Sequence, residues 1–237
     1  MSISNGQPGL LEPDEALPQV PLKPAPWRLE ASAYVLAVRM PEDVIDRASF
    51  VPPVLAGKRR GQTAYVLYVD YKVADVGPYQ ELLVAPAVYD FGEGEYPTIT
   101  RIYVSTYESV VNGRRNWGIP KDRADFAAET VAKNTDAVRV SRDGRVFADM
   151  KFQSYGLALP VTSWVLPAGL RTLMQYWHGK TYRFTISAKG SMKMAKMIEW
   201  RFDPEYFPDL ARGKVLAAAY FPHFEMTFPV SQVREVG

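Results

Sequence analysis

Short runs of β-branched and aromatic residues, separated by turn residues, fill most of the chain from Ser32 onward. This pattern is typical of half-buried strands, and it predicts them at 32–40, 62–74, 78–89, 98–104, 181–187, 192–202 and 214–228. A hairpin is predicted at 138–146, because Asp143-Gly144 readily adopts the positive φ angles of a tight turn. Since helices do not alternate with these strands, a parallel βαβ architecture is excluded. The sequence predicts one antiparallel, β-rich domain.

Helical patterns interrupt the strands at a few places. The clearest covers 105–116, where Ser105 and Glu108 have the spacing of a capping box and Gly118 follows the last turn. Two shorter helices are also predicted, one at 42–48 after Pro41 and one directly after Asp203-Pro204. Residues 90–97 are predicted to form a loop.

The first 26 residues differ from the rest of the chain because prolines recur from Pro8 to Pro26. Prolines at this density exclude a helix and favour an extended arm. One interpretation is a disordered leader. The other is an arm that lies over its own barrel or over a neighbouring subunit. The second is favoured by the apolar residues of the segment, which are Leu10, Leu11, Leu17, Val20 and Leu22.

Composition removes several functional classes. The 237 residues include no cysteine, so disulfides, thiolate metal sites and a cysteine nucleophile are excluded. The formal net charge of +2 is too small to attract nucleic acid, and we expect no nucleic-acid partner. The two histidines are His178 and His223, and no second histidine lies near either, so we expect no metal site.

The chain opens with neither the basic nor the apolar segment of a secretory signal. No apolar run approaches the ~18 residues that a membrane helix requires. We therefore expect a cytoplasmic protein with no membrane partner.

The sequence GRRNWGIPK, which ends at Lys121, is the most informative segment. Pro120 holds the preceding residue extended and fixes its own φ, so the chain leaves the predicted helix in a defined direction. If a strand begins near Ile119, its period of two places Ile119 and Lys121 on one face. Tyr79 and Glu81, two apart in another predicted strand, also share a face. A lysine beside these residues would form an enclosed amine site. The spacing alone favours an ordinary exposed lysine, and the enclosed site is the alternative.

At these residues the chain resembles the acetoacetate decarboxylase family. In that family a helix ends in the pattern G-R-x-x-x-x-x-P-K, and the final lysine forms a Schiff base with a β-keto acid. The residues that fit the pattern are Gly113, Arg114, Pro120 and Lys121, and a Gly-x-Tyr-x-Glu-like stretch upstream matches Gly77, Tyr79 and Glu81. Weaker matches flank these motifs in the right order, so the resemblance covers most of residues 27–230.

The resemblance implies the fold and the chemistry. The expected fold is mainly β (α+β): a single-domain antiparallel barrel or cone over 27–237, with a few short peripheral helices, preceded by the arm at 1–26. The expected activity is decarboxylation of a small β-keto acid through an imine on Lys121, with Glu81 assisting proton transfer. No cofactor or metal is expected, because the protonated imine itself accepts the electrons. A homo-oligomer is expected from the family and from the apolar arm.

Further side chains are expected to bind the substrate. Tyr79 and Ile119 are placed beside Lys121 by their positions in the predicted strands. An arginine has to hold the substrate carboxylate, and Arg28 is the first candidate because it lies near the family's N-terminal arginine. Arg114 is the second candidate, although capping the end of its own helix is its favoured role.

Two departures from the family pattern bear on the reaction. The family has a second lysine directly after the catalytic one, and Asp122 stands there in this chain. An adjacent carboxylate in the pocket would stabilise the ammonium form of the lysine, but neighbours in an extended chain point to opposite faces. We therefore expect Asp122 outside the pocket and burial to favour the neutral amine. The family also has an acid on the strand before Glu81, whereas residues 63–69 contain none and Asp70 is the nearest substitute.

Two other functions remain open on these grounds. One is a Schiff-base aldolase or dehydratase that acts on 2-oxo acids on the same fold. The other is a non-catalytic barrel that binds a small ligand, with Lys121 as its counter-ion.

Overall fold

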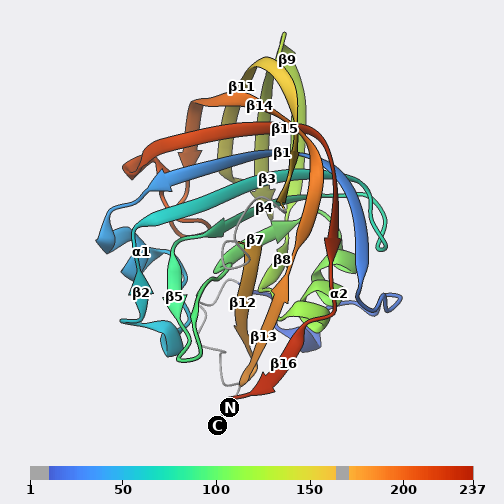
Figure 1. Cartoon of the computed structure of the whole chain (residues 1–237), viewed down its shortest axis with the longest axis vertical. Helices are drawn as coiled ribbons and strands as arrows, with labels where there is room; N and C mark the ends of the chain where they lie inside the picture. The colour runs from blue at the N-terminus through green and yellow to red at the C-terminus, as the bar shows by residue number, and fades with distance from the viewer. Residues whose placement is uncertain (1–10, 164–170, 237) are drawn as a thin grey trace.

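The computed structural model describes residues 11–163 and 171–236, and Figure 1 shows their arrangement. The strands are β1 (Trp27–Arg39), β2 (Arg59–Arg60), β3 (Thr63–Val73), β4 (Tyr79–Ala85), β5 (Val88–Asp90), β6 (Glu95–Pro97), β7 (Arg101–Val104), β8 (Lys121–Arg123), β9 (Asp125–Ala132), β10 (Thr135–Arg142), β11 (Arg145–Thr162), β12 (Thr172–Trp177), β13 (Lys180–Thr185), β14 (Ser187–Phe202), β15 (Lys214–Phe228) and β16 (Gln232–Glu235). The α-helices are α1 (Glu42–Ala48) and α2 (Tyr107–Trp117), and short 3-10 helices are η1 (Asp14–Ala16), η2 (Pro53–Leu55) and η4 (Leu210–Arg212). Within these described ranges no helix is long and apolar enough to cross a membrane.

Among the described residues, ten strands form one large sheet, in the order β8-β7-β4-β3-β1-β15-β14-β11-β10-β9. Its neighbouring strands pair antiparallel, except that β7 and β8 are parallel. The strands at the two ends of this order, β8 and β9, follow each other in the chain with Ala124 between them. Because one residue spans only ~4 Å, the sheet has to curl until its two edges meet there. The predicted mainly β, barrel-like fold with peripheral helices is confirmed (Figure 1).

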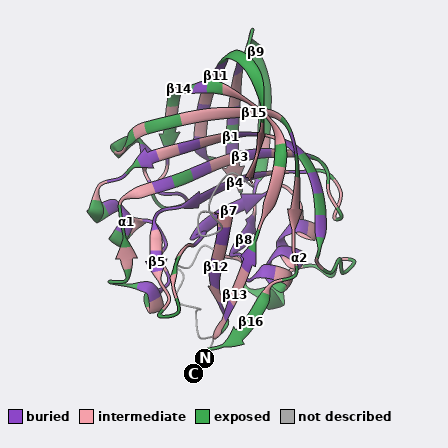
Figure 2. Ribbon diagram, viewed as in Figure 1, coloured by how far each residue is buried: buried purple, intermediate pink, exposed green. Residues whose placement is uncertain are grey.

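The sheet is buried on both faces near β4 and β7. Residues 82–85 and 101–104 are all buried, which gives the continuous purple bands of Figure 2. Since successive side chains of a strand point to opposite faces, this pattern requires packed side chains on each side of the sheet. We call the packing inside the curl the inner core, and the packing beneath α2, on the other face, the outer core.

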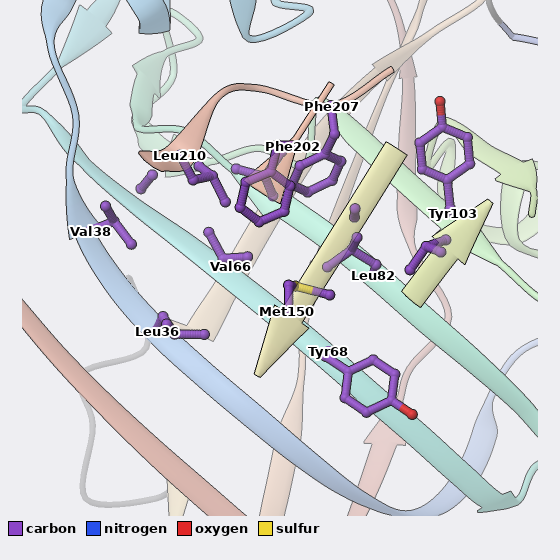
Figure 3. Packing of buried hydrophobic residues seen from close by; sticks show 14 of the residues in the cluster. Leu36, Val38, Val66, Tyr68, Leu82, Tyr103, Met150, Phe202, Phe207 and Leu210 are labelled. Atoms are coloured by element: carbon purple, nitrogen blue, oxygen red, sulfur yellow. The ribbon is translucent and has the colours of Figure 1, made fainter. Parts of the chain in front are cut away.

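The inner core joins strands that lie far apart in the sheet order. Tyr34 of β1 stacks on Phe152 of β11 with ring centroids 4.4 Å apart, and the rings of Tyr103 in β7 and Phe147 in β11 lie 4.5 Å apart. Leu82 packs among such residues (Figure 3). Each large side chain buried here contributes about 1.5–3 kcal/mol of hydrophobic stabilisation. This packing holds the sheet in its curled form.

The outer core contains a cluster of aromatic side chains beside α2. Trp27 of β1 and Trp117 at the end of α2 meet edge to face with centroids 4.7 Å apart. Phe184 of β13 and Phe228 of β15 complete the group, at 6.4 Å and 5.2 Å from the Trp117 ring. The small sheet of β12, β13 and β16 thus packs against the same helix as the large sheet.

The described part of the N-terminal arm lies against α2 of its own chain. The backbone N–H of Lys23 donates to Asn112 Oδ1 at 2.7 Å, and Asn112 Nδ2 donates to the carbonyl of Pro21 at 3.1 Å. Leu10 lies outside the described residues. A domain boundary at residue 26 stays a prediction.

Helix α2 begins one residue later than the capping-box pattern predicts. Its N-cap is Thr106, whose hydroxyl accepts a hydrogen bond from the backbone N–H of Ser109. The hydroxyl of Ser105 accepts instead from the backbone N–H of Gln80 at 2.9 Å. The cap prediction is wrong because the Ser105 hydroxyl is used to bind the neighbouring strand.

The helix predicted after Asp203-Pro204 is a turn. The backbone N–H groups of Tyr206 and Phe207 both donate to the carbonyl of Asp203 at 3.0 Å, and the chain does not become helical again until η4 begins at Leu210. Pro208 explains the stop, because the residue before a proline is disfavoured in helical conformation. The helix α1 has its predicted bounds, and the predicted loop at 90–97 contains β6.

Candidate active site

Lys121 is the first residue of β8, at the point where the chain leaves α2. Gly118 ends the helix with φ of 61°, and its backbone N–H donates to the carbonyl of Arg114 at 2.9 Å. A side chain at Gly118 would be strained by this φ and would also collide with the Tyr182 ring, 2.5 Å from the added Cβ. After Ile119-Pro120, the backbone of Lys121 pairs in parallel with Ile102 of β7. The glycine and proline of the motif thus direct the lysine side chain into the outer core.

The amine of Lys121 is buried and fully engaged by side chains. Its Nζ donates to Glu81 Oε2 and to Ser109 Oγ, each at 3.0 Å, and it lies 5.0 Å from the centroid of the Tyr79 ring. Both Lys121 and Glu81 are 4 % exposed. Burial penalises the charged form of each group, whereas their proximity stabilises the ion pair. Together they form a buried acid–base pair.

Gly113 makes room for the lysine beneath α2. A Cβ atom at this position would lie 2.6 Å from Cδ and 2.8 Å from Cε of Lys121. Ser109 stands four residues earlier on the same helix, and residues at this spacing share one helical face. The face of α2 that covers the lysine therefore provides both the space for its stem and a hydrogen-bonding partner for its amine.

Two stacked tyrosines complete the polar part of the site. The rings of Tyr71 and Tyr79 lie 4.4 Å apart, and the Tyr71 hydroxyl donates to Glu81 Oε1 at 3.3 Å. Burial, reinforced by the nearby Glu81 carboxylate, raises the pKa of both tyrosines well above the usual value of 10.0. Both phenols are therefore neutral proton donors across the physiological range.

A small cavity of about 20 Å³ lies beside the amine. It is lined by Trp27, Leu29, Tyr71, Tyr79, Glu81, Leu83, Ile99, Ile102, Trp117, Ile119, Lys121 and Phe228. This volume is close to that of one water molecule, so a keto acid enters only if lining side chains move. The lining is apolar and aromatic apart from the polar groups already described.

Asp122 points away from this cavity, into the inner core. It is fully buried, and its carboxylate accepts a short hydrogen bond from Arg142 of β10 and another from the backbone N–H of Arg123 at 3.0 Å. The alternation of the strand thus separates the adjacent residues Lys121 and Asp122 by the thickness of the sheet. The carboxylate next to the lysine in sequence lies outside the amine site.

The structure does not bring Arg28 to the site. Arg28 is exposed on β1, between the inward residues Trp27 and Leu29, and its backbone N–H donates to Asp75 Oδ2 at 2.8 Å. The reason is the period of two of the strand, which turns the arginine away when its two neighbours line the cavity.

Arg114 is buried next to the site but has structural contacts. Its Nε donates to the carbonyl of Lys121 at 2.8 Å, and its Nη1 contacts the carbonyl of Glu12 at 2.8 Å and Asp14 Oδ1 at 2.5 Å. Its guanidinium carbon lies 5.4 Å from the centroid of the Trp177 ring. Arg114 therefore fastens the arm and the strand β8 to helix α2, and it is absent from the described residues that line the cavity.

Ser109 and Tyr71 belong to the site although no sequence motif identifies them. The helical spacing of Ser109 and Gly113 is a signal that would have found the serine. Tyr71 is paired with Tyr79 across the β3–β4 hairpin, so the correct strand register would have found the tyrosine. Asp70 does not replace the missing acid, because its carboxylate binds Lys72 Nζ at 2.6 Å and Val69 is the residue opposite Glu81.

No group of three histidine, aspartate or glutamate side chains in the described parts of the chain could hold a metal ion.

Known proteins share this fold. The family model described as acetoacetate decarboxylase (ADC) matches residues 15–236. An acetoacetate decarboxylase from Legionella pneumophila superposes with a TM-score of 0.70 and 14% identity, covering 92% of each chain. An acetoacetate decarboxylase-like enzyme from Sphingomonas wittichii RW1 gives 0.66 and 11%, covering 91% of this chain and 95% of that one. The enduracididine biosynthesis enzyme MppR, complexed with pyruvate, gives 0.60 and 14%, covering 91% and 92%. At such identities the structural likeness shows the fold alone, and no curated protein sequence matches significantly.

Proposed function

Because the chain belongs to the acetoacetate decarboxylase family, we propose that it is a Schiff-base enzyme that decarboxylates a small β-keto acid such as acetoacetate. The observation that carries this proposal is the buried pair of Lys121 and Glu81, whose Nζ and Oε2 atoms lie 3.0 Å apart. The face of α2 that contains Gly113 covers this pair. An amine in this position has a proton acceptor in contact and is protected from bulk water.

The first step is formation of the nucleophile. An ammonium cannot attack a carbonyl carbon, and free lysine has a pKa of about 10.4. Transfer of one proton from Lys121 Nζ to Glu81 Oε2 converts the buried ion pair into a neutral amine and a neutral acid. The transfer needs no further base, because the carboxylate already contacts the amine at 3.0 Å.

The covalent steps then balance within the site. The nitrogen lone pair of Lys121 attacks the ketone carbon, and the resulting hydroxyl leaves as water with the proton held by Glu81. The product is a protonated imine. The bond to the carboxylate carbon breaks, carbon dioxide leaves, and the electron pair of that bond moves toward the imine nitrogen to give an enamine. The imine is the electron sink, so the reaction requires no cofactor.

Release of product needs a proton and a water molecule. Glu81 gave its proton to the departing water, so its carboxylate first takes up a proton from solvent and then passes it to the enamine carbon. This is the one proton that decarboxylation of a keto-acid anion consumes overall. The neutral phenols of Tyr71 and Tyr79 lie beside this carboxylate. Water then attacks the new imine and frees both the ketone and the Lys121 amine. A positioned proton donor of this kind contributes roughly 10²–10⁴-fold to a rate.

The experiment is to supply acetoacetate in water enriched in oxygen-18. An imine mechanism replaces the ketone oxygen by solvent oxygen, so the released acetone should carry the label at early times. The Lys121→Arg variant should give neither labelled acetone nor carbon dioxide above the uncatalysed rate. Fast decarboxylation without label beyond the uncatalysed exchange would overturn the imine mechanism.

A second candidate function is aldol or dehydration chemistry on 2-oxo acids. Its support is the structural likeness to MppR, described as complexed with pyruvate, together with the absence of an acid from residues 63–69. Incubation with pyruvate and small aldehydes, followed by product analysis, separates it from decarboxylation. Ligand binding without turnover of either substrate class would support a non-catalytic barrel.

We also infer a cytoplasmic homo-oligomer with a small-molecule keto acid as its partner. The lack of cysteine is compatible with a reducing compartment. Sedimentation at micromolar concentration should give a mass above that of one chain, and a stable monomer would contradict the association.

A further inference from the structure

The cavity beside Lys121 has no excess positive charge. The amine of Lys121 and the Glu81 carboxylate form an ion pair at 3.0 Å, so the cation is balanced before any ligand arrives. Among the described residues that line the cavity, no other cation is present. A ligand that enters meets a neutral surface that consists largely of hydrocarbon and aromatic rings.

The arginines nearest in sequence do not change this balance. Arg28 is exposed and lies outside the lining, among residues of a different surface depression that includes Glu30 and Lys189. Arg114 faces the arm, where Asp14 neutralises it. The Nη2 atom of Arg114 is buried without a hydrogen-bond partner among the described residues, but the guanidinium lies over Trp177 and not in the cavity.

The absence of a free cation among these lining residues has different consequences for the carboxylate of a 2-oxo acid and for that of a β-keto acid. A carboxylate that is buried without a cation is strongly destabilised. A 2-oxo acid keeps its carboxylate beside the carbonyl carbon throughout imine formation and any later condensation. A β-keto acid loses its carboxylate as neutral carbon dioxide once the imine has formed. The lining therefore opposes a 2-oxo acid at every step, whereas it opposes a β-keto acid only until the imine has formed and then favours the departure of neutral carbon dioxide.

We propose that this site, granted the Schiff-base function above, selects ketones and β-keto acids with apolar chains and discriminates against carbonyl compounds that retain an adjacent carboxylate. The apolar chain packs against residues such as Ile119, Ile102 and Trp117, which are 1–2 % exposed. Hydrocarbon surface moved from water onto these side chains stabilises the complex, whereas a charged group gains nothing there.

Phe228 marks the rim of this apolar surface. It is half-buried, whereas the other residues that line the cavity are buried. It packs against Trp117 with centroids 5.2 Å apart and is paired in register with Trp27. A ligand that enters along this side passes the Phe228 ring, and a charged side chain at this position could remain partly in water.

A matched pair of probes tests the selectivity. Pyruvate and 3-methylbutan-2-one have the same methyl ketone and the same number of non-hydrogen atoms, but an isopropyl group replaces the carboxylate in the second. Each is titrated against the wild-type protein in the presence of borohydride, and the reduced adduct is measured by intact mass. The same titration is carried out on Nα-acetyl-lysine, whose side-chain amine is free. Each half-saturating concentration for the protein is divided by the value for Nα-acetyl-lysine, which corrects for the intrinsic reactivity of the two ketones. We expect a corrected preference of at least tenfold for 3-methylbutan-2-one.

A pair of variants tests the electrostatic cause. Phe228→Arg places a cation at the rim, and Phe228→Leu opens the rim without a charge. The measured quantity is the ratio of pyruvate adduct to 3-methylbutan-2-one adduct. This ratio should be at least fivefold higher in Phe228→Arg than in Phe228→Leu. Equal ratios in the two variants would overturn the electrostatic explanation.

The outcomes with the wild-type protein separate the two proposals. Equal or better corrected trapping of pyruvate overturns the selectivity while the imine function stands. Failure of both probes and of acetoacetate to form an adduct overturns the Schiff-base function and the selectivity with it.

Discussion

Lys121 and Asp122 are adjacent in sequence, and each forms a buried ion pair on its own face of the sheet. Lys121 binds Glu81 in the outer core, whereas Asp122 binds Arg142 in the inner core. The side chains of Lys121 and Glu81 are 4 % and 5 % exposed, but that of Arg142 is 21 % exposed, so the second pair reaches solvent at one end.

The two pairs differ in what their cation can do. Arginine keeps its proton under all ordinary conditions, so the pair in the inner core is fixed and serves as a structural link between β8 and β10. Lysine can give its proton to the carboxylate beside it, and the outer core supplies neutral phenols and a cavity at the same place. Burial of charge alone therefore does not mark the active site. A transferable proton next to a cavity does.

The largest loss of activity is expected for Lys121→Arg. The variant keeps a cation beside Glu81 but cannot form an imine, because the guanidinium retains its proton. We expect kcat to fall by ~10⁴-fold or more, as for loss of a covalent nucleophile. Carbon dioxide release from acetoacetate is the measurement, and wild-type turnover in this variant would refute the site.

The next largest effect is expected for Glu81→Gln. Glutamine keeps the shape and a hydrogen bond to the amine but cannot accept its proton, so turnover should fall by ~10²–10³-fold. The imine should still form slowly and be trapped by borohydride. The matched control is Glu205→Gln, a partly exposed carboxylate paired with Arg145, which should leave the rate unchanged. An unchanged rate in Glu81→Gln would remove this residue from the chemistry.

Gly113→Ala should lower kcat by ~10²-fold without abolishing it. The added methyl group would displace the stem of Lys121, and a shift of about 1 Å at a reacting group commonly has this effect. Arg115→Ala, at an exposed position of the same helix, is the control. Alanine is a better helix former than glycine, so a thermal midpoint that stays level while the rate falls would assign the loss to the lysine position. An unaffected rate would show that α2 does not constrain the amine.

Asp122→Asn tests the ion pair on the other face of the sheet. Asparagine removes the Asp122 carboxylate from Arg142, which keeps its longer ion pair with Asp143 at 3.9 Å. Because Arg142 is also partly exposed, we expect a loss of about 1–3 kcal/mol in the free energy of unfolding. Denaturant unfolding measures this loss, and kcat of the folded variant should stay within twofold of wild type. A large fall in kcat at full stability would mean that the two faces of the sheet are not independent.

The smallest effect concerns alkaline pH. The pKa of Tyr71 is raised well above 10.0 by burial and by Glu81, whereas in the unfolded chain it is about 10. Above pH 10 the unfolded state releases a proton that the folded state keeps, so the free energy of unfolding falls as pH rises. Tyr71→Phe should make this fall shallower by up to about 1.4 kcal/mol per pH unit. An identical slope in the variant would show that Tyr71 ionises normally in the folded protein.

The parts of this arrangement that follow from local rules could be predicted from sequence. The period of two places Lys121 and Asp122 on opposite faces, and the glycine and proline of the motif fix where β8 begins. The N-cap of α2 could not be predicted from the local pattern, because the Ser105 hydroxyl binds β4 instead of the helix end. The prediction that Arg28 binds the substrate rests on the family resemblance alone, and it is wrong because the alternation around Trp27 and Leu29 turns Arg28 away from the cavity. The N-cap of α2 and the orientation of Arg28 depend on strand register and on packing between distant segments, which no single segment of the sequence determines.

Covalent trapping shows whether Lys121 is the amine that attacks the substrate. The wild-type protein is incubated with acetoacetate and borohydride, digested, and mapped by peptide mass spectrometry over time. The account predicts that the peptide containing Lys121 gains the reduced adduct before any other lysine-containing peptide, and that Lys121→Arg gains none at a comparable rate. Earlier modification of another lysine, or equal trapping in Lys121→Arg, would contradict it.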